Sequence, residues 1–67
     1  MTRGTVKWFN DQKGYGFITS ETREEFFVHR ASIEGQGFRT LREGERVEFE
    51  AKTGARGSEA SHVTRIS

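Results

Sequence analysis

The chain has 67 residues, no cysteine and a formal net charge of +1 from eleven basic and ten acidic side chains. This length fits one small domain, and the missing cysteines exclude a disulfide framework and a thiolate metal site. The near-neutral charge argues against a protein that binds duplex nucleic acid mainly through phosphates, because such proteins are usually strongly basic. No apolar run approaches the roughly 18 residues of a membrane span, and no signal-peptide pattern is present. We therefore expect a cytoplasmic protein.

Three short strands are predicted in the first half of the chain, where β-branched and aromatic residues gather: residues 5–10, 15–19 and 26–29. Segment 10–14 between the first two is typical of a hairpin connection, because Gly14 can adopt a positive φ. If Ile18 and Val28 face the core, strand alternation places four rings on the outward side of the second and third strands: Tyr15, Phe17, Phe27 and His29.

The other rings of this region are assigned less directly. Phe26 shares the side of Val28 and is therefore assigned to the core. Trp8 and Phe9 are neighbours with opposite parity in the first strand. Alternation alone leaves open which of these two rings faces outward.

The second half of the chain is predicted to hold two more strands, at residues 46–53 and 59–66. Their expected inward residues are Val47, Phe49, Ala51 and Val63. Before them, residues 31–33 are expected to form a short helical turn with Ile33 pointing inward. Segment 34–42 is predicted to be a loop that carries Phe38, and residues 54–58 a flexible turn.

Five short strands without a long helix predict an all-β fold, a five-stranded antiparallel barrel that makes one domain of residues 1–67. Closure of the sheet removes free strand edges. The outward rings are not needed by such a core, and they match a surface that stacks the flat faces of bases. A patch of exposed rings can instead mark a protein-binding site.

Several blocks of sequence, in this order and spacing, resemble the bacterial cold-shock proteins. They are residues 4–10 (GTVKWFN), 13–18 (KGYGFI), 27–29 (FVH), 37–41 (GFRTL) and 43–44 (EG). The resemblance covers essentially the whole chain and implies an OB-fold barrel that binds single-stranded RNA and DNA. It also implies activity as an RNA chaperone, with roles in transcription antitermination and translation under cold or other stress.

The resemblance places Trp8 outward and gives Phe38 a base-stacking role on its loop. It also implies that Glu25 accepts a hydrogen bond from a base. Phe9 is expected to lie half-buried under the rings, and the cations beside them are candidates for phosphate contacts. The complete set of predicted binding residues is Lys7, Trp8, Phe9, Lys13, Tyr15, Phe17, Glu25, Phe27, His29, Arg30, Phe38 and Arg56.

The chain departs from the family pattern at several positions. Arg30 stands where a third phenylalanine commonly follows the histidine, and a guanidinium can both stack on a base and contact a phosphate. Ser58 and Glu59 replace the usual Pro-Gln, and a carboxylate cannot donate a hydrogen bond to a base. Phe26 replaces a valine, and Ala51 replaces a larger aliphatic residue. We hypothesise that these last two changes compensate in volume.

Catalysis and metal binding are not expected. The two histidines, His29 and His62, fall on different predicted strands, and no cysteine can complete a metal site. The sequence also lacks an evident nucleophile-and-base arrangement. We expect no cofactor, no small-molecule substrate and no membrane partner. The expected partners are single-stranded RNA and DNA, bound by a monomer.

Overall fold

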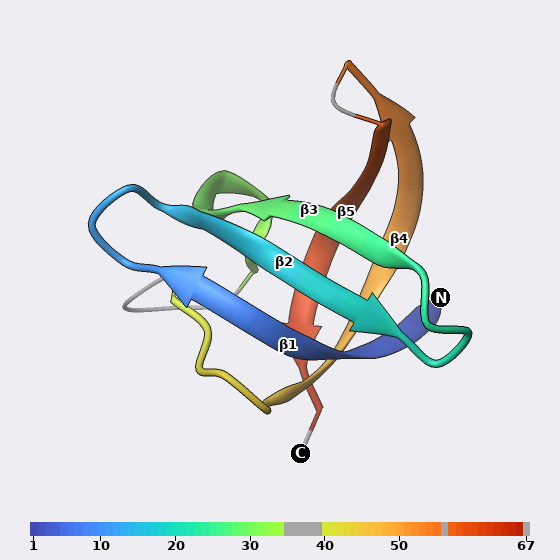
Figure 1. The fold of residues 1–67 in the computed structure, drawn as a ribbon, viewed down its shortest axis with the longest axis horizontal. Coiled ribbons are helices and arrows are strands. Elements are labelled where there is room, and N and C mark those ends of the chain that lie inside the picture. Colours follow the sequence, from blue (N-terminus) through green and yellow to red (C-terminus); the bar gives the residue numbers. More distant parts are fainter. Residues whose placement is uncertain (35–39, 56, 67) are drawn as a thin grey trace.

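The computed structural model describes residues 1–34, 40–55 and 57–66 (Figure 1). Within them lie five strands and one short 3₁₀ turn: β1 (Thr2–Asn10), β2 (Tyr15–Ser20), β3 (Glu25–His29), η1 (Arg30–Ser32), β4 (Arg46–Gly54) and β5 (Gly57–Arg65). Two of the predicted binding residues, Phe38 and Arg56, lie outside the described residues.

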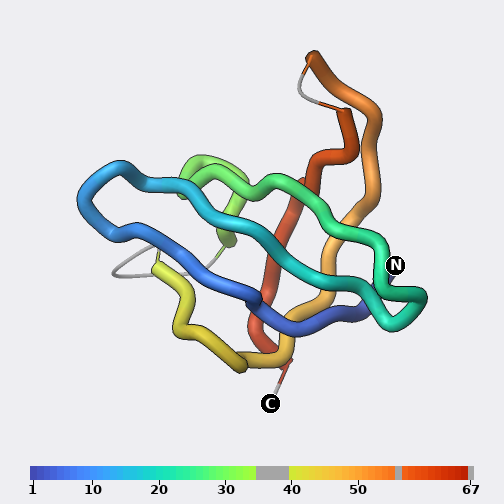
Figure 2. Tube along the Cα trace, viewed as in Figure 1, coloured from blue at the N-terminus to red at the C-terminus, as the bar shows by residue number. Residues whose placement is uncertain are grey.

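The strands close into a barrel in the order β1-β2-β3-β5-β4, and the path of the chain can be followed in Figure 2. The predicted all-β, five-stranded barrel is therefore confirmed. Strands β3 and β5 run parallel, paired at Phe27 and Glu59, whereas the other four neighbouring pairs are antiparallel. Five strands in a closed ring cannot all alternate in direction, so at least one contact must be parallel.

Strand β1 begins at Thr2, three residues before the predicted start at Thr5. The intervening Gly4 argues against a strand in the sequence, because glycine is depleted in strands. In the structure Gly4 pairs with both Ser20 of β2 and Val47 of β4. A Cβ at Gly4 would lie 2.6 Å from the carbonyl oxygen of Thr19. Glycine is thus needed here for the close approach of β2 rather than to end the strand.

Among the described residues, the core contains ten buried hydrophobic residues: Val6, Ile18, Phe26, Val28, Ile33, Leu41, Val47, Phe49, Ala60 and Val63. The inward assignments of Ile18, Phe26 and Val28, on which the outward direction of the rings depends, are confirmed. Ile33 is also buried, and it pairs with Val63 of β5 just after the 3₁₀ turn.

The inward assignment of Ala51 is wrong, because this residue is exposed. Pairing between β4 and β1 ends at Phe49 and Thr2, and beyond that point the β4–β5 hairpin projects away from the barrel (Figure 1). Phe26 packs instead on Phe49, with ring centroids 5.0 Å apart. The hypothesis that Phe26 and Ala51 compensate in volume is therefore also wrong.

A bulge in β5 reverses the inward–outward alternation of this strand. Even-numbered residues before the bulge and odd-numbered residues after it can therefore both point into the core. Glu48 pairs with Thr64 and Glu50 with Ser61, so two residues of β5, one of them His62, lie opposite one residue of β4. His62 has a φ of 51° and is exposed. Its Nδ1 lies 2.5 Å from a carboxylate oxygen of Glu34.

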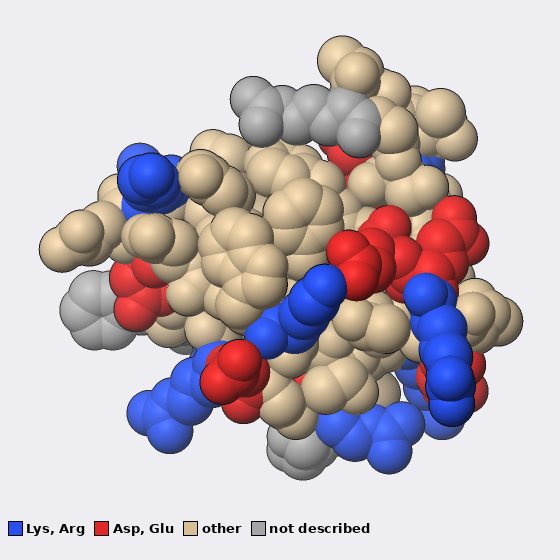
Figure 3. All heavy atoms as spheres, viewed as in Figure 1, with Lys and Arg blue, Asp and Glu red and all other residues tan. Residues whose placement is uncertain are grey.

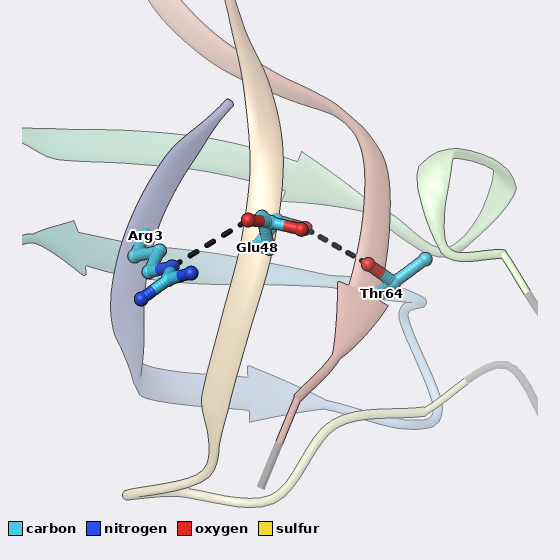
Figure 4. Close-up of polar contacts among 3 residues, drawn as sticks. All are labelled: Arg3, Glu48 and Thr64. Atoms are coloured by element: carbon cyan, nitrogen blue, oxygen red, sulfur yellow. Dashed lines mark hydrogen bonds and ion pairs between the residues drawn. The ribbon is translucent and has the colours of Figure 1, made fainter.

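A polar contact connects the three strands β1, β4 and β5 on the outside of the barrel (Figure 4). Nε of Arg3 lies 3.5 Å from a carboxylate oxygen of Glu48, and these two residues pair directly across the strands. The hydroxyl of Thr64 donates to the backbone carbonyl of Glu48 at 3.4 Å. Because the ion pair is solvent-exposed, we expect it to contribute only about 0–1 kcal/mol to stability.

Candidate nucleic-acid interface

A bulge in β1 decides which of its two rings faces outward. Val6 pairs with Ile18 and Trp8 pairs with Phe17, so Lys7 is an extra residue that has no partner in the β2 register. Val6 is buried, whereas Lys7 and Trp8 are both exposed. The outward direction of Trp8, which alternation left open, is thereby settled, and Phe9 packs against the core.

The bulge aligns three rings across three strands. Trp8 of β1 pairs with Phe17 of β2, and Phe17 pairs with Phe27 of β3. One row further along, Tyr15 pairs with His29. Paired residues of neighbouring strands present their side chains on the same side of the sheet, so these side chains form one outward surface. We call it the ring face: Trp8, Tyr15, Phe17, Phe27 and His29.

The rings of this face contact one another. Phe17 lies 5.5 Å from Trp8 and 5.8 Å from Phe27, measured between ring centroids. Tyr15 is 5.8 Å from both Trp8 and Phe27. These spacings lie in the range of favourable aromatic pairs, so the four rings hold one another in place.

The ring face is open to solvent. Trp8 is 37% exposed, a large fraction for a tryptophan, and the other three aromatic rings of the face are half-buried. Figure 3 shows a largely uncharged surface over the middle of β2 and β3, with charged side chains along β1 and acidic atoms gathered toward the β2–β3 connection. The flat faces of these apolar rings are therefore accessible to solvent instead of being packed into the core.

His29 is oriented by the backbone that follows it. Its Nδ1 accepts a hydrogen bond from the backbone N–H of Ala31 at 3.1 Å, which also caps the 3₁₀ turn. In the neutral imidazole the proton then resides on Nε2. His29 can therefore donate a hydrogen bond from a ring whose orientation is already fixed.

Phe9 lies beneath the ring face rather than on it. It is half-buried and packs against the core, directly opposite Gly16 of β2. A Cβ at Gly16 would overlap the carbonyl oxygen of Trp8 and would lie 2.7 Å from Cα of Phe9. We therefore expect Phe9 and Gly16 to support the position of Trp8, and not to stack on a base themselves.

Replacing Gly16 with alanine is expected to destabilise the fold by about 1–3 kcal/mol, as overpacking typically does. The clashing atoms belong to the β1 backbone, so they cannot rotate away. Urea unfolding measures the loss. Gly44→Ala is the comparison, because Gly44 has a φ of +86° but open space around it. Of the two variants, only Gly16→Ala is expected to shift the Trp8 fluorescence of the folded protein. An unchanged emission spectrum and an unchanged urea midpoint in Gly16→Ala would contradict this prediction.

Lys7, the extra residue of the β1 bulge, is already paired. Nζ of Lys7 lies 2.6 Å from a carboxylate oxygen of Glu25, and both side chains are about half exposed, at 50% and 49%. The predicted phosphate contact of Lys7 and the predicted base contact of Glu25 therefore compete with this ion pair.

Two further cations lie at the β1–β2 hairpin end of the face. Lys13 is exposed, and its backbone N–H donates to Oδ1 of Asn10 at 2.9 Å. The backbone N–H of Arg30 donates to the carbonyl oxygen of Gly14 at 2.8 Å. The Arg30 side chain then lies over Gly14, where a Cβ would be 2.8 Å from its Cδ. Arg30 directly follows His29, and Lys13 lies two residues before Tyr15, so both stand at the end of the Tyr15–His29 row.

Within residues 1–34, 40–55 and 57–66 there is no group of three or more histidine, aspartate or glutamate side chains that could hold a metal ion. No helix among them is long and apolar enough to cross a membrane.

The family of the 'Cold-shock' DNA-binding domain matches residues 2–66. The chain belongs to the cold-shock domain family. It is 54% identical to the cold shock-like protein CspLB of Listeria monocytogenes, across 98% of this chain and 100% of that protein. Identity to the cold shock protein CspB of Bacillus caldolyticus is 52%, with the same coverage of both chains.

Membership of the cold-shock domain family confirms the resemblance stated from the sequence and supports nucleic-acid binding in the cold-shock response. The family is one of binding proteins rather than of enzymes. The fold is also like that of the Drosophila structure Unr CSD456, with a TM-score of 0.79 at 19% identity. That match covers 98% of this chain but 26% of the Drosophila chain.

Two further residues lie beside the rings in the structure. Asn10 pairs with Tyr15 on the outer row, and Glu59 pairs with Phe27 through the parallel contact of β3 and β5. The hairpin spacing between residues 10 and 15 carried enough information to place Asn10. Nothing local in the sequence indicates the partner of Phe27 on a strand thirty residues away.

Proposed function

We propose that this chain binds single-stranded RNA and DNA by stacking successive bases on the ring face. The observation that supports the proposal best is the row of three rings from three neighbouring strands, Trp8, Phe17 and Phe27. Every base has a flat π-face, so stacking on such a row tolerates many sequences and contributes about 1–3 kcal/mol per base. In a duplex the faces of the bases are already covered.

A protein that binds strands but not duplex shifts the melting equilibrium toward strands without consuming ATP, because ligand binding shifts an equilibrium only through differential affinity. We infer that the chain acts in this way as an RNA chaperone. Transcription antitermination and translation under cold or other stress are the processes in which we expect that activity to matter. The monomeric state and the cytoplasmic location remain predictions.

Trp8 is the only tryptophan of the chain and lies on the ring face, so its fluorescence reports directly on the proposed site. Titration with a short pyrimidine oligonucleotide is expected to quench this fluorescence strongly. The oligonucleotide should be recovered uncut after incubation. An unchanged emission spectrum would instead support a protein partner for the exposed rings, and a cleaved oligonucleotide would indicate a nuclease.

The salt dependence of binding should be shallow. The logarithm of the binding constant falls with the logarithm of salt concentration, with a slope of about −0.7 per phosphate contact on single strands. Lys7 is already paired with Glu25, and the net charge of the chain is only +1. We expect a slope no steeper than about −2, equivalent to roughly three phosphate contacts. Titrations at several NaCl concentrations measure it, and a much steeper slope would show that phosphates, not rings, dominate.

A further inference from the structure

The row of rings leads from β3 over β2 to β1, and the next strand around the barrel is β4. A nucleic-acid strand stacked on Phe27, Phe17 and Trp8 is therefore directed toward β4 where it leaves the rings. In Figure 3 several basic side chains lie along β1 and on its side away from β2, whereas acidic atoms gather toward the β2–β3 connection. The phosphates of the strand are attracted to the basic side and repelled by the acidic side.

A row of polar side chains lies beside the ring face and ends on β4. Thr19 of β2 pairs with Thr5 of β1, and Thr5 pairs with Arg46, the first residue of β4. Arg46 is exposed and precedes the fully buried Val47, so its side chain points outward. Phe17 and Thr19 are two residues apart on β2, which places this row about 7 Å from the rings. We call it the polar row: Thr5, Thr19 and Arg46.

All three side chains of the polar row can donate hydrogen bonds. Within residues 1–34, 40–55 and 57–66 none of the three forms a side-chain hydrogen bond or an ion pair. The neighbouring cations of β1 differ in this respect, because Arg3 lies 3.5 Å from Glu48 and Lys7 lies 2.6 Å from Glu25. A phosphate that binds at Arg46 therefore displaces no carboxylate from that guanidinium.

We propose that the polar row is a phosphate-binding site for the nucleotides that flank the stacked bases on the β4 side. Arg46 supplies a positive charge and a planar guanidinium that can hold two phosphate oxygens at once. The hydroxyl of Thr5 donates a further hydrogen bond to the same phosphate. Because the ligand is the phosphodiester backbone, the site adds affinity without adding a base preference.

This inference rests on the proposed function, because a strand must stack on the ring face before it is directed toward β4. It goes further by extending the binding surface from the rings of β1, β2 and β3 to β4. A consequence is that the contribution of Arg46 depends on the length of the bound strand. A strand that covers only the ring face does not reach Arg46, whereas a longer strand does.

The experiment titrates wild type and Arg46→Gln with oligothymidines of about four and about ten nucleotides while Trp8 fluorescence is followed. Arg46→Gln is expected to bind the longer strand about fivefold more weakly than wild type, and the shorter strand as tightly as wild type. For the longer strand, the slope of log K against log salt should become shallower by about 0.7 in the variant. Comparison with wild type at each length cancels the larger number of positions that a longer strand can occupy.

Lys52→Gln is the matched control, since it removes the same charge from an exposed residue of β4 on the projecting hairpin. It should bind both strands as wild type does. Thr5→Val removes the hydroxyl at constant charge, so it should weaken only the longer strand and leave the salt slope unchanged. Unchanged binding by Thr5→Val would overturn the role of the hydroxyl. Urea unfolding checks that each variant is folded.

Equal binding of the longer strand by Arg46→Gln and wild type would overturn the phosphate site while leaving the proposed function intact. Equal losses with both strands, or a similar loss in Lys52→Gln, would also overturn it, because Arg46 would then act through the net charge of the protein. No quenching of wild type with either strand would overturn the proposed function, and this inference with it.

Discussion

Replacing Phe17 with alanine is expected to weaken the binding of a short pyrimidine oligonucleotide by roughly 5- to 150-fold, the equivalent of about 1–3 kcal/mol for one stacked base. Phe17 is the middle ring of the row and contacts Trp8 and Phe27 on either side. Its removal takes away one stacking surface and also the packing that supports the rings of Trp8 and Phe27. Tyr15 also contacts both rings, but it belongs to the next row, whereas Phe17 pairs directly with Trp8 and with Phe27.

Phe17→Leu is the control that separates stacking from packing. Leucine fills most of the space beside Trp8 and Phe27 but has no π-face, so it should preserve the fold and still lose most of the affinity. Phe17→Tyr keeps the ring and should bind nearly as wild type. Affinity is measured by quenching of Trp8, with circular dichroism to check folding. Wild-type affinity in a folded Phe17→Ala variant would show that bases do not stack at the centre of the row.

The outward rings of β2 and β3 could be predicted from the sequence because these strands are regular. Their register runs without interruption from Tyr15↔His29 to Thr19↔Glu25, so the period of two held along both strands. Strand β1 behaves differently, because the extra residue Lys7 changes parity between Val6 and Trp8. A bulge reverses every assignment beyond it, and alternation cannot reveal a bulge. Only the resemblance placed Trp8 correctly.

Two other features were beyond a strand-by-strand interpretation. Alternation along β4 gave the side of Ala51 correctly, but it did not show that the barrel wall ends at Phe49 and leaves Ala51 in solvent. The pairing of Phe27 with Glu59 depends on how β3 and β5 meet when the sheet closes. Both are properties of the closed barrel and not of any one strand, so local pattern carries no signal for them.

Residues of the ring face and residues of the core alternate along the same strands, so binding depends on the stability of the core. The central rings of β2 and β3 are each followed by an inward residue, with Ile18 after Phe17 and Val28 after Phe27, and both inward residues are fully buried. The rings therefore hold their positions only while the core beneath them is packed. Within the part of the chain that the structure describes, Phe49 is the largest fully buried side chain of this core.

Replacing Phe49 with alanine is expected to cost about 3–5 kcal/mol in the free energy of unfolding, the usual range for a buried phenylalanine. Phe49 is fully buried and packs on Phe26, with ring centroids 5.0 Å apart. Small domains have a total stability near the low end of about 5–15 kcal/mol. Much of the Phe49→Ala protein should therefore be unfolded at room temperature. Urea unfolding gives the value, if any transition remains.

Two variants keep this test informative. Phe49→Leu should lose less stability and stay folded, and Ala51→Ile, on the same strand but exposed, should change stability by no more than about 0.5 kcal/mol. Phe49 does not belong to the ring face, so folded Phe49→Leu should bind oligonucleotide as wild type does. A saturating oligonucleotide should also raise its urea midpoint, because a ligand that binds only the native state stabilises it. Lost affinity in the folded variant would show that the ring face depends on the exact packing beneath it, and not only on the presence of a folded barrel.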